Sequence, residues 1–218
     1  MIDFKKIKAI IFDMDGVIVD SEHIHKAAEL EACRHFGIDA PIEEWEKFKG
    51  RTLKYIADYL IKKYASRKIK PHQFAKKKTD LYLEMAPKKI AEIPGAVDFI
   101  KKAKKKNFCL CLATSSLDVI RKLVFKKYNL HPYFSFVTTA DEVAHGKPHP
   151  EPYLKTVAKS GFLPAECAVI EDSDNGIISA KSAGCHAIGI TTSFGAEKLA
   201  EVGADLVVGG FDEIYERF

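Results

Sequence analysis

Short apolar runs alternate along this chain with segments of helical pattern. Several runs are continuously apolar, which is typical of parallel strands covered by helices on both faces. Six runs predict strands, at residues 8–12, 108–113, 134–139, 168–170, 187–191 and 205–208. Helices are expected between them, at residues 96–106, 117–128, 150–160, 175–183 and 196–201. The alternation indicates an α/β fold built on a doubly wound parallel sheet.

One long stretch interrupts this alternation. Residues 21–87 contain no convincing strand pattern, and three or four helices are expected to fill them. The stretch opens with Asp20-Ser21-Glu22, a plausible helix N-cap. Pro87 and Pro94-Gly95 mark the return to the alternating pattern, because both residue types punctuate helices. The pattern therefore predicts a helical insertion after the first strand.

Composition excludes some classes of protein. The chain has 218 residues, of which 47% are hydrophobic and 29% charged, so it is neither a membrane protein nor a disordered chain. No apolar run approaches the roughly 20 residues of a membrane-spanning helix, and the first residues do not resemble a signal peptide. The five cysteines are scattered without a C-x-x-C pair, which supports neither zinc nor disulfides. We expect a cytoplasmic protein without a membrane partner.

The net charge of +4 is unevenly distributed, and residues 61–106 are strongly basic. A basic segment can bind nucleic acid. The lysines here lie in helical stretches without interleaved aromatic residues, so solvated helix faces are the preferred interpretation and no nucleic-acid partner is expected. A basic entrance that attracts anionic substrates is a third interpretation.

The first predicted strand ends in Asp13-Met14-Asp15-Gly16-Val17. Two carboxylates one residue apart point the same way, and the glycine allows a sharp turn. Close like charges in a concave site are costly unless a cation neutralises them, and Mg²⁺ suits such an all-oxygen site. The simpler alternative is that Asp13 only caps the next turn.

Three further strand ends carry polar residues. Thr114 and Ser115 offer hydroxyls and turn amides that can hold phosphate oxygens, whereas Ser116 is expected to cap the following helix. The loop His145-Gly146-Lys147-Pro148 fixes one lysine, and the fourth strand ends in Glu171-Asp172. In parallel sheets ligands bind at the carboxyl ends of the strands, so these groups are expected at one edge.

The chain resembles the haloacid dehalogenase superfamily, within the group of β-phosphoglucomutase and related sugar-phosphate phosphatases. The resemblance rests on DMDGV at 13–17, LATSS at 112–116, GKPHPEPY at 146–153 and EDSDNGIISAKSAG at 171–184. It implies a Rossmann-like core domain at residues 1–17 and 91–218, and a helical cap domain at residues 18–90. The cap would close over the core through hinges near residues 17–21 and 87–95.

The resemblance also implies roles for the strand-end residues. Asp13 would attack phosphorus and form an aspartyl-phosphate, and Asp15 would serve as general acid and then general base. Thr114 and Lys147 would hold the phosphoryl group. Mg²⁺ would be bound by the Asp13 carboxylate, the main-chain carbonyl of Asp15 and Asp172, with Glu171 bound directly or just outside. The expected partner is a small phosphorylated metabolite.

The cap decides between a hydrolase and a mutase. His25 and Lys78 match a histidine and a lysine of the family's mutases, but Leu53 stands where the mutases have an arginine. Leucine cannot make the bidentate contact with phosphate that an arginine makes, so a bisphosphate would bind less tightly. Arg51 lies two residues earlier and could replace the missing arginine only if its loop shifts. The phosphatase is therefore preferred and β-phosphoglucomutase is the alternative. The remaining candidate substrate-binding residues are Ser115, Lys49, Gly50 and Arg51.

Two classes outside enzymes stay open, a phospho-receiver domain and a nucleic-acid-binding domain. Receiver domains lack a long helical insert and fall within the common domain length of about 100–150 residues.

Trp45 is expected in the core of the cap rather than as a platform for a sugar. A monomer is the default expectation.

Overall fold

A computed structural model describes residues 2–217. Its centre is a parallel sheet in the order β5-β4-β1-β6-β7-β8, which confirms the predicted fold class. Each of the six predicted strands is present, with slightly different ends. Their bounds are Ala9–Phe12 for β1, Cys109–Ala113 for β4, Phe134–Thr138 for β5, Cys167–Glu171 for β6, His186–Ile190 for β7 and Leu206–Val208 for β8.

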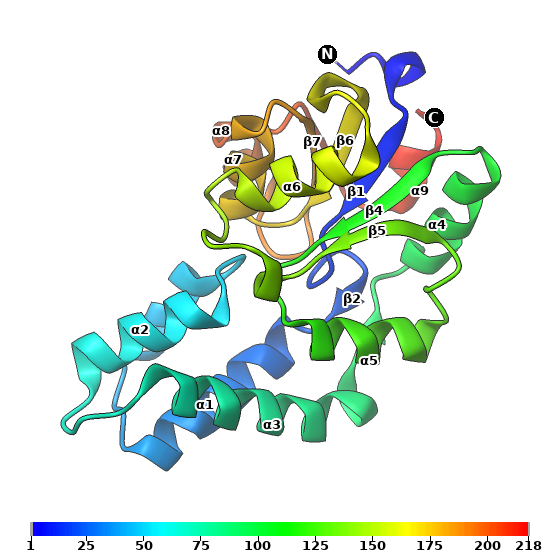
Figure 1. Ribbon diagram of the computed structural model, residues 1–218. Helices are drawn as coiled ribbons and strands as arrows, with labels where there is room; N and C mark the ends of the chain where they lie inside the picture. Colours follow the sequence, from blue (N-terminus) through cyan, green and yellow to red (C-terminus); the bar gives the residue numbers. More distant parts are fainter. Residues whose placement is uncertain (1, 218) are drawn as a thin grey trace.

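Helices cover both faces of this sheet (Figure 1). One face packs against α4 (Ala96–Lys105), α5 (Asp118–Tyr128) and α9 (Phe211–Tyr215), and the other against α6 (Glu151–Ser160), α7 (Asp174–Ser182) and α8 (Ala196–Glu201). The central strand shows why its sequence is continuously apolar. Ile10 and Phe12 face the first layer of helices, whereas Ala9 and Ile11 face the second. Short 3-10 helices lie at Phe4–Lys6, Ala140–Glu142 and Pro164–Glu166.

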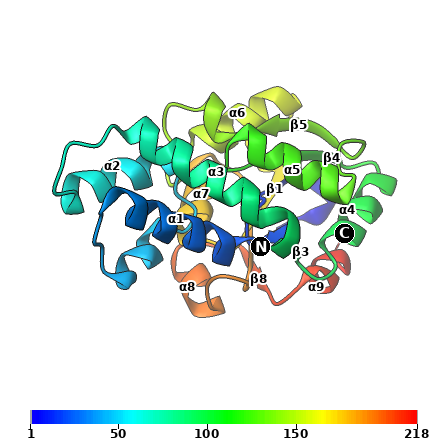
Figure 2. The same cartoon turned by 90° about the horizontal axis from the view of Figure 1, so that it is seen from below.

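The predicted helical insertion forms a separate layer below the strand ends (Figure 1). It contains α1 (Glu22–Phe36), the 3-10 helix η2 (Ile42–Phe48), α2 (Leu53–Tyr64) and α3 (Pro71–Lys89). Figure 2 shows α1 and α3 running side by side. The insert has its own apolar core, where Trp45 packs as expected, together with Phe48, Leu60 and Phe74.

Two connections join the insert to the sheet layer. Val19–Asp20 (β2) and Ala91–Glu92 (β3) pair in an antiparallel ladder, so both connections run next to each other. Strands of two residues leave almost no pattern, and the sequence did not predict them. The division into a core (1–17 and 91–218) and a cap (18–90) stays a prediction, and this ladder lies at its boundary.

Two local expectations need correction, and one helix is additional. Pro87 does not end its helix, because α3 continues to Lys89 with the proline inside its last turn, although proline has no N–H to bond to the preceding turn. Ser21 occupies the N-cap position of α1, but its side chain does not cap the helix. The short helix α9 was not expected.

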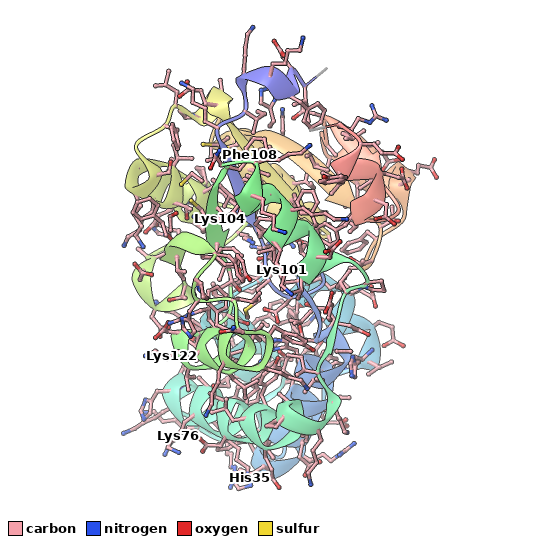
Figure 3. All side chains as sticks on the ribbon, turned by 90° about the vertical axis from the view of Figure 1, so that its right-hand side faces the viewer. His35, Lys76, Lys101, Lys104, Phe108 and Lys122 are labelled. Atoms are coloured by element: carbon pink, nitrogen blue, oxygen red, sulfur yellow. The ribbon has the colours of Figure 1, made fainter. Side chains whose placement is uncertain are left out.

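The helices of the described residues are short or polar, and many lysines lie on their surfaces (Figure 3). No helix within residues 2–217 combines the length and apolar character that crossing a bilayer requires. Lys76, Lys101, Lys104 and Lys122 are spread over α3, α4 and α5 (Figure 3). Many neighbouring lysines face nearby acids, as Lys76 does with Asp80 at 2.6 Å.

Candidate active site

The site lies where the chain reverses its path through the sheet. From β1 the chain builds outward through β4 and β5 on one side, and then returns to place β6, β7 and β8 on the other. Phe12, near the end of β1, pairs in register with Leu112 of β4 and Ile170 of β6. Because all three strands are parallel, their following residues meet at one edge, where such sheets bind ligands.

Lys147 lies between two carboxylates in the floor of the site. Its Nζ atom is 2.5 Å from Oδ1 of Asp13 and 2.6 Å from Oε1 of Glu171, and it also donates to the carbonyl of Ala113 at 3.1 Å. Only 1% of Lys147 is exposed. Burial alone would lower the pKa of Lys147, but the two carboxylates outweigh it and raise that pKa. The lysine is therefore a fixed cation directed at Asp13.

Asp13, Glu171 and Asp172 form a buried acidic cluster whose ligand oxygens lie within 4.8 Å of one another. Burial raises the pKa of Asp13 and of Asp172, and neighbouring carboxylates raise it further. Within residues 2–217, Lys147 alone forms ion pairs with this cluster. The cluster has more negative charge than this lysine balances, so its donor set suits a divalent cation.

Glu171 differs from the other two acids because its oxygens already have donors. Oε1 accepts from Lys147 and from the Tyr153 hydroxyl at 2.7 Å, and Oε2 accepts from the backbone N–H groups of Asp172 and Ser173 and the Ser173 hydroxyl. Burial would raise the pKa of Glu171, but these partners, Lys147 first, lower it. Glu171 thus holds Lys147 and the turn after β6 in place.

Gly16 gives Asp172 its place beside β1. The glycine has φ +79°, a left-handed conformation that favours glycine. A Cβ atom there would lie 1.8 Å from Oδ2 of Asp172. Any other residue at position 16 would displace the Asp172 carboxylate, so the position of Asp172 requires glycine here.

Asp15 is held by a second network on the cap side. One oxygen accepts from the Ser21 hydroxyl at 2.5 Å and lies 3.0 Å from Nε2 of His25, and the other accepts from the Ser116 hydroxyl at 2.7 Å. Burial would raise the pKa of Asp15, but His25 and the two hydroxyls outweigh it and hold that pKa well below its usual range. The Asp15 side chain is not part of the acidic cluster.

His25 connects Asp15 to the cap. Its Nδ1 atom lies 2.6 Å from Nζ of Lys78, and Lys78 in turn lies 3.7 Å from Oε1 of Glu29. Burial lowers the pKa of Lys78, and the charges of Glu29 and Asp15, which raise that pKa, only partly offset the effect of burial. His25 and Lys78, predicted separately from sequence, are thus brought together with Asp15 in one chain of polar contacts.

The turn after β4 differs in part from expectation. Ser116 does not cap α5, because Leu117 occupies the N-cap position without a side-chain bond, and the Ser116 hydroxyl is bonded to Asp15 instead. Thr114 is buried, and its Oγ1 accepts from the Ser116 backbone N–H at 3.0 Å. Ser115 donates to the Gly50 carbonyl at 2.8 Å. The turn therefore contacts both Asp15 and the cap.

The cap loop Lys49-Gly50-Arg51 rests on several core loops. Lys49 donates to the carbonyl of Ser193 at 3.3 Å, and Nδ2 of Asn175 donates to the carbonyl of Lys49 at 2.9 Å. Arg51 donates to the carbonyl of Lys147 at 3.4 Å. Its guanidinium lies 4.5 Å from the centre of the Tyr55 ring. The candidate substrate-binding loop is therefore docked against the strand ends.

A cavity of about 180 Å³ lies between this loop, α1 and the strand ends. Its floor includes Asp13, Asp15 and Asp172, and its walls include Ser115, the loop residues Lys49, Gly50 and Arg51, and the cap residues His25 and Lys78. Lys147 and Glu171 lie beneath the floor. Apart from Thr114, which is buried in the turn after β4 and does not line the cavity, the predicted residues lie around or directly beneath this one space.

Sequence reasoning missed several residues of this site. Ser21 is the N-cap of α1, and Glu22 and Glu29 lie within that helix. Asn175 lies in the first turn of α7, and Ser193 lies in a loop of the core. Asn175 lies within the EDSDNG motif and could have been marked as polar at a strand end. Nothing in the pattern distinguishes Ser193 from other loop serines.

The fold and the site define a parallel α/β enzyme with a carboxylate at the end of its first strand and a helical insert packed against that end of the sheet. Residues 10–190 match the family model described as haloacid dehalogenase-like hydrolase. The chain belongs to this family, as the strand-end motifs predicted. Fructose-1-phosphate phosphatase YqaB of Escherichia coli is 30% identical over 187 residues, covering 86% of this chain and 98% of that protein.

Solved structures agree with this assignment. CbbY from Rhodobacter sphaeroides, solved with phosphate, is 27% identical with a TM-score of 0.85, covering 95% of this chain and 96% of that one. A β-phosphoglucomutase from Clostridium difficile is also 27% identical, with a TM-score of 0.83, covering 97% of this chain and 96% of that one. The comparisons confirm the predicted enzyme class, a phosphatase-like hydrolase with phosphoglucomutase as the alternative.

Proposed function

We propose that this chain is a Mg²⁺-dependent phosphomonoester hydrolase acting on a small phosphorylated metabolite, a sugar phosphate, through an aspartyl-phosphate on Asp13. The observation that carries the proposal is the pairing of Asp13 with buried Lys147 at 2.5 Å, at the floor of a cavity that Asp15 also lines. The similarity to a fructose-1-phosphate phosphatase supports the substrate class.

Asp13 is the proposed nucleophile. Its carboxylate attacks phosphorus, and the bond to the leaving oxygen breaks. Lys147 is held by Asp13 and Glu171, so its charge is already in place when negative charge develops on the phosphoryl oxygens. The Thr114 hydroxyl and the Ser115 backbone N–H lie in the turn beside it and would donate to these oxygens, whereas the Ser115 hydroxyl already donates to the Gly50 carbonyl.

Asp15 is the proposed proton carrier. In its protonated form it would donate to the leaving oxygen, and as a carboxylate it would accept a proton from the water that attacks the aspartyl-phosphate. The resting network favours the carboxylate. His25 lies between Lys78 and Asp15, so these cap residues can supply or remove the proton.

Asp13, Asp172 and the Asp15 main-chain carbonyl would hold Mg²⁺, with Glu171 supporting them from just outside. When bound, the ion screens the repulsion between the carboxylate nucleophile and the anionic phosphate. The buried Asp172 carboxylate accepts a hydrogen bond from the Ser193 hydroxyl and keeps room for a metal ion, which fits a ligand role. Both carboxylate oxygens of Glu171 already accept hydrogen bonds.

Two observations favour hydrolysis over the mutase reaction, which would interconvert β-glucose 1-phosphate and glucose 6-phosphate. Leu53 is buried in the cap core, at 8% exposure, and offers no charge to a second phosphate. Arg51 donates to the Lys147 carbonyl and its guanidinium lies over the Tyr55 ring, so it would have to leave both contacts to replace the missing arginine.

The test is ³¹P NMR of the purified chain with Mg²⁺, β-glucose 1-phosphate and a trace of glucose 1,6-bisphosphate, followed by a panel of sugar and polyol phosphates. Release of inorganic phosphate, lost on removing Mg²⁺ with a chelator, is the expected result. Formation of glucose 6-phosphate would make the mutase correct instead. No turnover of any phosphomonoester would contradict the proposed activity.

A further inference from the structure

The loop that follows β7 contacts the acidic cluster, the turn after β1 and the cap within three consecutive residues. Strand β7 pairs in parallel with β6, so its loop leaves the sheet at the same edge as Asp172. Thr192 contacts the turn after β1, Ser193 contacts Asp172, and both Ser193 and Phe194 contact the cap. This loop therefore joins parts of the site that come from distant segments of the chain.

Ser193 holds the carboxylate of Asp172. Its hydroxyl donates to Oδ2 of Asp172, and within residues 2–217 it is the only hydrogen-bond donor to that side chain. Asp172 is 3% exposed, so bulk water does not surround it. A carboxylate has about four acceptor sites on its two oxygens, so one bond from serine fixes its rotation and leaves the others for a cation. Carboxylates that bind metals are commonly oriented by such a bond.

Thr192 fixes the same loop against β1. Its hydroxyl donates to the carbonyl of Gly16 at 2.6 Å. Gly16 in turn packs against Oδ2 of Asp172, the oxygen that also accepts from Ser193. Two neighbouring residues of the loop thus hold the Asp172 carboxylate and the backbone that packs against it.

The cap contacts this loop through Lys49. The Nζ atom of Lys49 donates to the carbonyl of Ser193 at 3.3 Å and lies 4.6 Å from the centre of the Phe194 ring. A cation at this distance from an aromatic ring is attracted to it. Phe194 also packs against the apolar cluster on the α6, α7 and α8 side of the sheet, so its ring has a fixed place in the core. The ammonium group of a cap residue therefore lies one peptide away from the group that orients Asp172.

We propose that Ser193 is a positioning residue for Asp172, and that Lys49 links docking of the cap to binding of the metal ion by holding Ser193 and Phe194. When the cap loop is docked, the Ser193 hydroxyl keeps Asp172 in the orientation that binds the ion. The link is reciprocal, since an ion that favours this orientation favours the docked loop by the same factor. The inference rests on the Mg²⁺-dependent hydrolysis proposed above and adds how the closed cap completes its metal site.

The first test measures Mg²⁺ binding by isothermal titration calorimetry without substrate. Ser193→Ala should raise the Kd for Mg²⁺ by about 10-fold, whereas Ser193→Thr, which keeps a hydroxyl, should stay within about threefold of the wild type. At saturating Mg²⁺, kcat of Ser193→Ala should return close to the wild-type value, because Ser193 contacts Asp172 and does not line the cavity. Ser66→Ala, at an exposed bend of the cap, is the control and should leave the Kd unchanged.

The second test separates the link from simple electrostatics. Lys49→Met keeps the length of the side chain but removes its charge and its donor. Loss of a positive charge near an acidic cluster by itself strengthens the binding of a cation. Loss of the link acts in the opposite direction, and we expect a Kd for Mg²⁺ about threefold higher. In the Ser193→Ala background, Lys49→Met should not raise the Kd further, because the two residues act through one contact.

The matched control for Lys49 is Lys47→Met. It removes the same charge two residues away, where Lys63 still pairs with Glu44, and it should not raise the Kd. Circular dichroism checks that each variant is folded. An unchanged Kd in Ser193→Ala, or an unchanged or lower Kd in Lys49→Met, would overturn the inference while Mg²⁺-dependent hydrolysis by the wild type stands. Absence of Mg²⁺ binding by the wild type would also overturn it, and phosphate release then decides separately whether the proposed hydrolysis stands.

Discussion

Nζ of Lys147 lies 2.5 Å from Oδ1 of Asp13, with 1% of the lysine and 7% of the aspartate exposed. The pair joins residues 134 positions apart in the chain. Burying two charges is costly, and their attraction offsets that cost only when the geometry is good and further hydrogen bonds are made. Glu171 and the Ala113 carbonyl provide those bonds to Lys147. The fold therefore keeps Lys147 charged and in contact with Asp13.

Lys147→Ala should reduce both activity and stability. Removing a fixed charge that stabilises a transition state costs about 10²-fold or more in kcat. The free energy of unfolding should fall by about 3–5 kcal/mol, because Asp13 and Glu171 lose their buried partner. Phosphate release and guanidinium unfolding measure the two effects. Lys101→Ala, an exposed lysine of α4, is the control. A loss of rate below threefold would mean that Lys147 does not act on the phosphoryl group.

Asp13→Asn should abolish turnover and keep the fold. The amide is nearly isosteric with the carboxylate but does not attack phosphorus, so we expect a loss of at least about 10⁴-fold, as for other removed nucleophiles. Steady-state phosphate release measures the rate, and circular dichroism checks the fold. Asp98→Asn, which alters an exposed ion pair with Lys102, should leave the rate unchanged. Turnover by pure Asp13→Asn protein would contradict the nucleophile assignment.

The sequence predicted the sheet and the floor of the site because both follow from short-range patterns. Continuous apolar runs mark buried parallel strands, and Asp13, Asp15, Lys147 and Asp172 directly follow such runs or lie in a punctuated loop. A parallel sheet then brings strand ends together whatever the lengths of the connections. The predicted strands are therefore present with small differences at their ends.

The contacts between cap and core could not be predicted in the same way. The partner of Ser116 is 101 positions away, and a serine before a helix has a local role as a cap that is equally consistent with the pattern. Glu22 and Trp45 have ordinary surroundings in the sequence, and only the packing of α1 and η2 over the strand ends brings them to one cavity. Which side chains of the insert contact the core depends on how the insert packs against the sheet, and the local sequence pattern does not determine that packing.

Glu171 and Asp172 should differ in their effect on magnesium. Asp172→Asn removes a proposed ligand, so the Mg²⁺ concentration for half-maximal activity should rise by about 10- to 100-fold. Glu171→Gln should mainly destabilise the fold, since Glu171 accepts from Lys147, Tyr153 and the turn after β6. Activity at varied Mg²⁺ and chemical unfolding without the ion separate the effects. An equal rise in the Mg²⁺ requirement of both variants would place Glu171 in direct contact with the ion.

His25→Ala should change how stability depends on pH. His25 holds the pKa of Asp15 below its usual value near 3.9, so this stabilisation is fully present above about pH 4 and is lost as the pH falls through the lower, folded-state value. The variant should therefore be less stable near neutral pH, with a pH-dependent part of about 1.5–3 kcal/mol that shrinks below about pH 4. Urea unfolding across this range measures it. His35→Ala, at an exposed position of the same helix, should show the wild-type pH profile.

Asn175→Ala should weaken the docking of the cap loop without touching the acidic cluster. The Nδ2 atom of Asn175 donates to the carbonyl of Lys49 at 2.9 Å, and Ser115 donates to the neighbouring carbonyl of Gly50. If the cap closes over bound substrate, losing one of these bonds costs binding in the closed state, and KM should rise by about 3- to 10-fold. Ser115→Ala should act in the same direction, whereas Ser66→Ala, on an exposed bend of the cap, should leave KM unchanged. An unchanged KM in Asn175→Ala would mean that closure does not depend on this contact, and that substrate enters a cavity already held shut by the remaining contacts of the loop.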